Sequence, residues 1–304
     1  MVGSSGRFSC QAPRWAAVPA VAVLLVGCAA APSGQPPGSS GSARQAPRDG
    51  VGRAAPPSGG DPQAALATWR SFPIQATPRP LVLTAGNVLD PPTGFVTGDQ
   101  KVAYIGGQFT LATALPAAPS TSGGYPIVTA KAALDRLRAN FSHEKAVSPL
   151  RIVNAVLGKA TFGTDRGPEA LPAWRFTLDG VAGAVQVLAI APTALWPAKP
   201  LPIGSQEQAS IAADGQTVTY NFYGSPPGPS PCGAEYAGRV TESRTAAVIS
   251  VQVDMPNPAG SNGAADQACA AIAALRTVTV RLAAPRGGRV LLTAQGTPIS
   301  VTGG

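Results

Sequence analysis

The stretch that decides the fold class is PIVTAKAALDRLRANF, residues 126–141. Its apolar residues recur at the spacing of one helix face, and they are Ile127, Leu134, Leu137 and Phe141. The other face is charged, with Lys131 and Asp135 at the i,i+4 spacing that allows an ion pair. Proline is favoured in the first turn of a helix. The pattern therefore predicts an amphipathic helix that begins at Pro126.

Short runs of strand-forming residues surround this helix. Before it, residues 80–84 form an apolar run. Residues 101–115 are rich in strand formers with a Gly106-Gly107 break, which suggests two strands or a bulge. After the helix come three further runs, at residues 150–157, 173–178 and 184–190. One helix followed by three strands predicts a helix packed on one face of an antiparallel sheet.

The chain changes character after a proline-rich stretch at residues 192–202. Residues 208–213 and 216–222 alternate across Asp214-Gly215, which predicts a β-hairpin. Further strands are expected at residues 235–242, 246–254, 277–282 and 289–293, with a short Ala-rich helix at 264–275. About six short strands in roughly 100 residues are typical of a small sandwich.

The predicted fold class is therefore α+β, with an N-terminal helix packed on an antiparallel sheet, followed by a small β-sandwich-like C-terminal region. This division gives an α+β domain at residues 61–203 and a β-rich domain at residues 204–304. Each piece is long enough to hold a core of its own. Whether they are two domains or one continuous unit is left open.

The composition excludes several classes of protein. The 304 residues include 35 glycines and 32 prolines, far above ordinary usage, while charged residues are only 12%. The glycines follow no three-residue period, which excludes collagen, and the low charge excludes a charged coiled coil. The net charge is +8, but residues 61–304 hold 18 Lys and Arg against 14 Asp and Glu. With no basic cluster, no nucleic-acid partner is predicted.

The N-terminus carries a targeting signal. Arg7 and Arg14 precede a mostly apolar run at residues 15–26, which has signal-peptide length and is short for a bilayer span. The run ends in LVGC, residues 25–28, which resembles a bacterial lipobox. The resemblance implies diacylation of Cys28 and cleavage before it. An ordinary secretory signal with a chance cysteine, or a core helix, is the alternative.

This interpretation divides the first part of the chain at Cys28. Residues 1–27 are a lipoprotein signal peptide, and residues 28–60 are the lipidated cysteine and a disordered tether rich in Gly, Pro, Ser and Ala. Two acyl chains give stable anchoring. The folded part is then expected at the outer face of the cytoplasmic membrane, attached through the N-terminal lipid.

The remaining cysteines predict a disulfide. Cys10 lies in the discarded signal and Cys28 takes the lipid, which leaves Cys232 and Cys269. Two cysteines in an oxidising exterior favour one structural disulfide. A metal site or a redox pair is the alternative, but the sequence has no CxxC and no nearby histidine. No metal or cofactor is predicted.

Two strings form the most distinctive local pattern, TFGTDRGPEALPAWRF at residues 161–176 and GPSPCGAEY at residues 228–236. With the lipobox, they resemble segments of uncharacterised secreted proteins and lipoproteins of actinobacteria. The resemblance implies a compartment and no activity, so no site residues are carried over from it.

The TDRG piece of the first string, residues 164–167, reads as a turn between two strands. Asp165 can accept backbone N–H groups, and Arg166 can pair with Asp165 or Glu169 or present its guanidinium to an anion or glycan. Trp174 and the alternating aromatic residue beyond it are expected to pack on the helix. Asp165 and Arg166 are therefore the candidate ligand contacts.

Known catalytic signatures are missing from the sequence. The single histidine, His143, follows the predicted helix beside Glu144 and suits a surface position. HExxH, GxSxG, GxGxxG and Walker patterns are absent. No catalytic residue is nominated, although a carboxylate pair assembled in space leaves no sequence signature.

The leading hypothesis is a lipid-anchored, non-catalytic binding or accessory module of the cell envelope. Its partner would be a wall polymer, a lipid or another protein. The alternatives are an extracytoplasmic hydrolase with a carboxylate-based site and a purely structural lipoprotein. A two-lobed solute receptor fits less well, because the repeated βαβ pattern is missing.

Overall fold

The computed structural model describes residues 59–91, 93–141, 148–201, 207–228, 233–255 and 273–303. Cys28 and most of the tether, His143, and both Cys232 and Cys269 lie outside these ranges. Among the described residues, strands account for 43% and helices for 13%, so the protein is sheet-rich. None of the described helices is long and apolar enough to cross a membrane.

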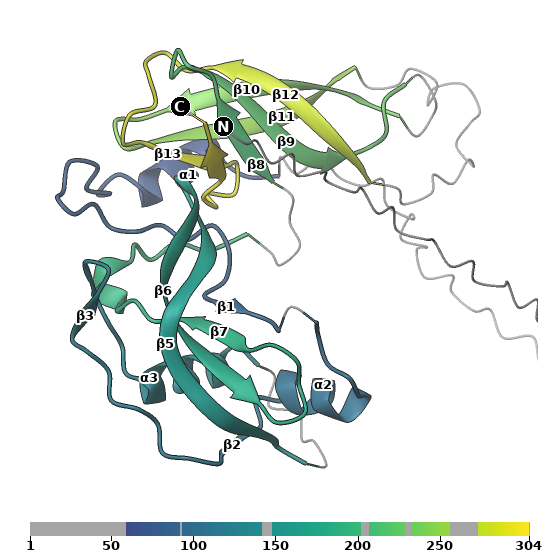
Figure 1. Ribbon diagram of the computed structural model, residues 1–304. Helices are drawn as coiled ribbons and strands as arrows, with labels where there is room; N and C mark the ends of the chain where they lie inside the picture. Colours follow the sequence, from purple (N-terminus) through teal and green to yellow (C-terminus); the bar gives the residue numbers. More distant parts are fainter. Residues whose placement is uncertain are drawn as a thin grey trace, which may run out of the picture. The chain divides into compact units, whose positions relative to one another are not determined.

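A five-stranded sheet dominates the first half, in the order β1-β7-β6-β5-β2 (Figure 1). Its strands are β1 (Val88–Leu89), β2 (Phe109–Leu111), β5 (Leu150–Thr164), β6 (Gly167–Leu178) and β7 (Val185–Leu188). The three predicted strands after the helix are confirmed as antiparallel neighbours. The edge strand β2 runs parallel to β5, so the sheet is mixed.

Helix α3 (Ala130–Ala139) packs on this sheet, as the sequence predicts. Leu134 and Leu137 are buried against Trp174 and Phe176 of β6. The ion pair between Lys131 and Asp135 forms at 2.7 Å, although both side chains are exposed. These contacts follow the period of the apolar face.

The predicted start of α3 at Pro126 is wrong. Pro126 belongs to β4 (Tyr125–Pro126), which pairs with β3 (Thr121–Ser122), and Ile127 forms a bridge with Ile190. The helix begins only after Thr129, whose hydroxyl accepts a hydrogen bond from the N–H of Ala132. A threonine N-cap satisfies a backbone donor that no helical residue can.

The two strands expected within residues 101–115 are replaced by α2 (Gly98–Ile105) and the short β2. Thr97 and Gln100 form a capping box, which stabilises a helix start ahead of the strand-forming residues. Tyr104 of α2 is buried in the same core as α3. Local capping thus prevails over residue propensity, which is a weak determinant by itself.

Two further sheets make up the second half. One contains β10 (Glu235–Glu242), β11 (Ala246–Met255) and β13 (Val290–Thr293), and the other contains β8 (Gln208–Ile211), β9 (Thr217–Gly224), β12 (Ala274–Arg281) and β14 (Ser300–Thr302). Their inner faces share one hydrophobic core. The predicted hairpin is confirmed, with Gly215 at φ 66° between β8 and β9.

Strand β14 was not predicted. Most of the predicted helix at 264–275 lies outside the described residues, while its end, Ala274 and Leu275, is strand.

Helix α1 (Pro62–Thr68) was also not predicted, and it packs on the outer face of β11 and β13 (Figure 1). Asp61 caps its first turn by accepting a hydrogen bond from the N–H of Gln63. Leu66 and the following Trp69 share a core with Val248 and Leu292. This core joins residues from both sides of the boundary expected near residue 203, and the division into two domains stays a prediction.

Candidate functional site

The turn at residues 164–167, which carries both candidate ligand contacts, joins β5 to β6. The side chain of Asp165 is 0% exposed. Arg79 donates to both of its carboxylate oxygens, at 3.3 Å and 2.6 Å. Arg286 donates to the backbone carbonyl of Asp165 at 2.7 Å and reaches its carboxylate at 3.5 Å. The protein's own arginines therefore hold this carboxylate.

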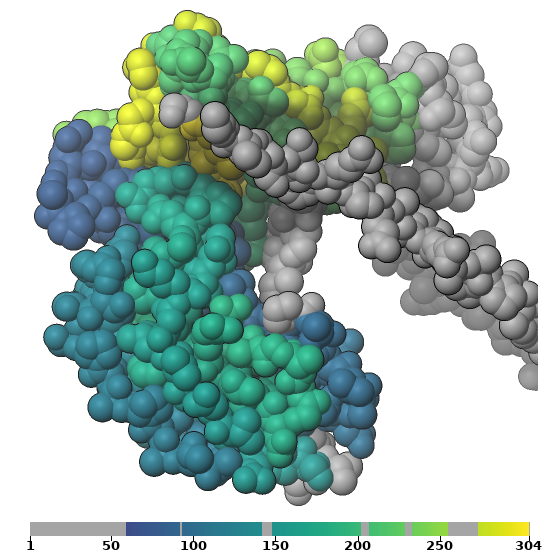
Figure 2. Space-filling model, viewed as in Figure 1, coloured from purple at the N-terminus to yellow at the C-terminus, as the bar shows by residue number. Residues whose placement is uncertain are grey.

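This ionic cluster ties three distant segments together. Arg79 also donates to the carbonyl of Gly288 at 3.1 Å and lies over the ring of Phe72 at 4.6 Å. Burial lowers the pKa of the Arg286 guanidinium, while Asp165 opposes that shift. A buried carboxylate shared by two guanidiniums positions the end of the hairpin beside residues 286–288. Figure 2 shows this end of the hairpin against the C-terminal strands.

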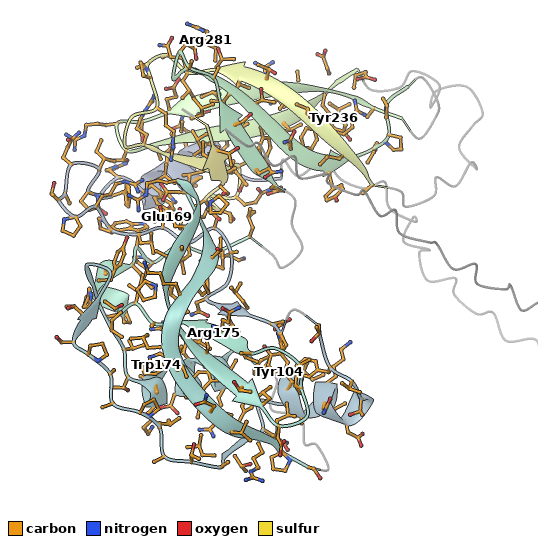
Figure 3. All side chains as sticks on the ribbon, viewed as in Figure 1. Tyr104, Glu169, Trp174, Arg175, Tyr236 and Arg281 are labelled. Carbon is orange, nitrogen blue, oxygen red and sulfur yellow. The ribbon has the colours of Figure 1, made fainter. Side chains whose placement is uncertain are left out.

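Arg166, the second candidate, turns away from this cluster. Its Nε lies 3.1 Å from Oε1 of Glu169, and its side chain is 41% exposed. Of the two partners that the sequence allowed, the structure thus selects Glu169. Figure 3 shows Glu169 at the end of the hairpin, with Trp174 further along β6. A ligand contact by Arg166 or Asp165 stays a prediction.

A hollow of about 480 Å³ lies along one flank of α1, and we name it the tryptophan hollow. It is lined by residues 60, 61, 64, 65, 68 and 69, by residues 196–199 and by residues 294–296. Two of the chain's four tryptophans, Trp69 and Trp196, lie in its wall. Polar side chains of Asp61, Thr68 and Lys199 surround them. Its volume is in the range of small-molecule sites.

Ring contacts and a hydrogen bond hold the aromatic residues of this hollow in place. The rings of Trp69 and Trp196 lie 6.0 Å apart, and Phe72 meets Trp196 edge-on at 5.0 Å. The indole N–H of Trp69 donates to the carbonyl of Gly296 at 3.2 Å. Because Arg79 covers Phe72, the ionic cluster at Asp165 supports the same wall. Trp69 is only 3% exposed, so the half-buried Trp196 supplies the accessible part of this wall.

A smaller hollow of about 220 Å³ lies along the other flank of α1, and we name it the arginine hollow. Gln63, Leu66, Ala67 and Arg70 line it from α1 and its end, and residues 242–245 line it from the β10–β11 turn. Arg70 and Arg244 are both exposed. A third, open groove of about 690 Å³ runs between the edge strands β10 and β12.

Each of the three hollows contains a single carboxylate side chain, Asp61 in the tryptophan hollow and Glu242 in the other two. Burial raises the pKa of Glu207, although its hydrogen bond with Tyr220 acts in the opposite direction. Burial also raises the pKa of Tyr104, whose hydroxyl donates to Asp90 at 2.6 Å. Within the described ranges, no group of three or more His, Cys, Asp or Glu residues is placed to hold a metal ion.

Sequence reasoning missed Trp69, Trp196, Arg79 and Arg286. For Trp69 a signal existed, because Asp61 followed by Pro62 is a typical start of a helix. Trp196 lies in a proline-rich stretch without periodicity, so nothing local indicated its position.

No protein-family model, no curated protein and no solved structure matches the chain. The resemblance to actinobacterial secreted proteins stays a prediction.

Proposed function

We propose that the chain is a lipid-anchored binding module of the cell envelope, and that the tryptophan hollow holds a saccharide of the wall. The single observation that carries the proposal is the half-buried ring of Trp196, braced by the buried Trp69 and Phe72, beside polar side chains. Aromatic surfaces with a few convergent polar groups suit ligands that present both C–H faces and hydroxyls. The partner is therefore a wall polymer, in preference to a lipid or a protein.

The proposed architecture is a helix packed on a sheet, followed by a small β-sandwich. The shared core of the two C-terminal sheets supports the second half of this description. The proposed location is the outer face of the cytoplasmic membrane, with Cys28 as the lipid acceptor. The LVGC sequence at residues 25–28 supports the anchor. The disulfide between Cys232 and Cys269 belongs to the same proposal.

The binding proposal is tested by Trp196→Ala, measured with the lipidated chain in detergent micelles against oligosaccharides released from the host wall. Affinity should fall about fivefold or more, because aromatic anchors usually carry more than about 1 kcal/mol of binding free energy. Tyr223→Ala is the matched control, since Tyr223 is an exposed aromatic residue of β9 that does not line the hollow. Equal affinity of all three proteins would contradict the proposal.

The anchor is tested by Cys28→Ala expressed in the native host. The variant should take up no labelled fatty acid and should partition into the aqueous phase. Membrane retention of Cys28→Ala would contradict the lipobox interpretation.

The second candidate function is a hydrolase with a carboxylate-based site, although each of the described hollows contains a single carboxylate side chain where glycoside hydrolysis uses a pair. If this function is right, new reducing ends should appear when the protein is incubated with wall glycans. If the protein binds the glycans and no reducing ends form, the binding module is preferred.

A further inference from the structure

Helix α1 separates the two hollows described above. Its residues Ala64 and Thr68 line the tryptophan hollow, whereas Gln63 and Ala67 line the arginine hollow. A helix with its side chains is about 10–12 Å across, so the two hollows are that far apart across α1. The exposed residues of α1 between them are Ala64, Ala67 and Thr68, which are small or short, and the longer Gln63. A polymer can therefore cross α1 from one hollow to the other.

The arginine hollow has an excess of positive charge. Arg70 and Arg244 line it, and within the described ranges neither makes an ion pair with another side chain. The third charged residue is Glu242, whose carboxylate is occupied by Arg289 and by the N–H of Ala283. Guanidinium groups bind carboxylates and phosphates in a bidentate manner. This hollow is suited to an anionic group.

The turn that carries Arg244 is hydrogen-bonded to the backbone at the end of α1. The hydroxyl of Ser243 accepts hydrogen bonds from the N–H groups of Thr245 and Ala246. The hydroxyl of Thr245 donates to the carbonyl of Trp69 at 2.8 Å and is buried. The backbone positions of Arg244 and Trp69 are thus set relative to one another, as a site with two contact points requires.

We infer that the bound polymer is an acidic glycan, whose sugar ring enters the tryptophan hollow and whose carboxylate or phosphate is held by Arg70 and Arg244. The inference rests on the proposed function and names its ligand class. The neutral part of the ligand contacts the aromatic wall, and the anion contributes a charge-assisted contact across α1.

The test uses the lipidated chain in micelles and three disaccharide probes. These are the neutral N-acetylglucosamine disaccharide, the same disaccharide carrying a 6-phosphate, and the disaccharide of N-acetylglucosamine with N-acetylmuramic acid, which carries a carboxylate. At low salt, at least one acidic probe should bind about tenfold more tightly than the neutral probe. The difference should shrink as salt is added, because exposed charges are screened.

The double variant Arg70→Gln/Arg244→Gln should remove this preference and leave neutral-probe affinity unchanged. Both side chains are exposed, so the variant should fold. Arg239→Gln is the matched control, since Arg239 is exposed on β10 and lines neither hollow. Whichever acidic probe is preferred identifies the anion as a carboxylate or a phosphate.

The outcomes separate the two proposals. Equal binding of neutral and acidic probes, or a preference that survives in the double variant, overturns the acidic-glycan inference and leaves the saccharide proposal standing. No binding of any probe by the wild-type chain overturns both.

Discussion

Two turns of this protein are built around an aspartate and a glycine, and they use the aspartate in opposite ways. At residues 164–167, Asp165 is buried and bonds to Arg79 and Arg286, which are 86 and 121 residues away in the chain. In the β8–β9 hairpin, Asp214 is exposed and accepts hydrogen bonds from the N–H groups of Gln216 and Thr217. One carboxylate joins distant segments, and the other shapes its own turn.

The comparison shows which part of the structure the hydrogen bonds of each aspartate hold in place. Most bonds of Asp214 form with its neighbours and shape the hairpin, and the one distant partner is Arg281 of β12, which donates to its carboxylate at the surface. The bonds of Asp165 fix Arg79, which covers Phe72, and Phe72 braces Trp196 in the wall of the tryptophan hollow. The buried turn therefore positions the proposed binding site, whereas the exposed turn lies away from it.

The largest loss of stability is expected for the variant Asp165→Asn. The variant leaves two largely buried guanidiniums without their carboxylate, and breaking a buried ion pair costs about 3–5 kcal/mol. Urea denaturation should show a loss of free energy of unfolding in this range. A loss of unfolding free energy below about 1 kcal/mol would mean that the ionic cluster does not hold these segments together.

A smaller effect is expected for Arg79→Gln. Asp165 keeps Arg286 as a partner, so the loss should be about 1–3 kcal/mol, the cost of leaving a buried group partly unsatisfied. Saccharide affinity should also fall in this variant, because Arg79 supports Phe72. Unchanged affinity would show that the ionic cluster and the tryptophan hollow are independent.

The smallest effect is expected for Asp214→Asn, and it should depend on pH. Hydrogen bonds from the N–H groups of Thr217 and Gln216 hold the pKa of Asp214 well below its ordinary value. A carboxylate with a lowered pKa in the folded state stabilises the protein above its unfolded pKa of about 3.9, and that stability is lost as the pH falls through the lower folded value. The variant should therefore be slightly less stable than wild type at pH 6, and the difference should begin to shrink only below about pH 4 and vanish as the pH passes the lower folded value. A difference that persists at low pH would contradict the carboxylate account.

The same contrast explains what could be predicted from the sequence. The Asp214-Gly215 hairpin and the buried face of α3 were predicted because short-range chemistry and helical period encode them. Of the strand-forming residues 101–115, the strand at Phe109–Leu111 is confirmed, whereas residues 101–105 are helical because the capping box at Thr97 and Gln100 starts a helix there.

The candidate site was beyond sequence reasoning for a different reason. Asp165 and Arg166 were singled out as a turn, but the partners of Asp165 come from segments near residues 79 and 286. The aromatic wall combines Trp69 with Trp196, which are likewise far apart in the chain. No local pattern records such pairings, because only tertiary packing brings these side chains together.

The most direct test of the central claim is the tryptophan emission of the full chain in detergent micelles during titration with the N-acetylglucosamine–N-acetylmuramic acid disaccharide. The account predicts a saturable change in the wild-type protein, which is lost in Trp196→Ala and retained in Tyr223→Ala. No change in the wild-type protein, or the same saturable change in Trp196→Ala, would contradict a saccharide site in the tryptophan hollow.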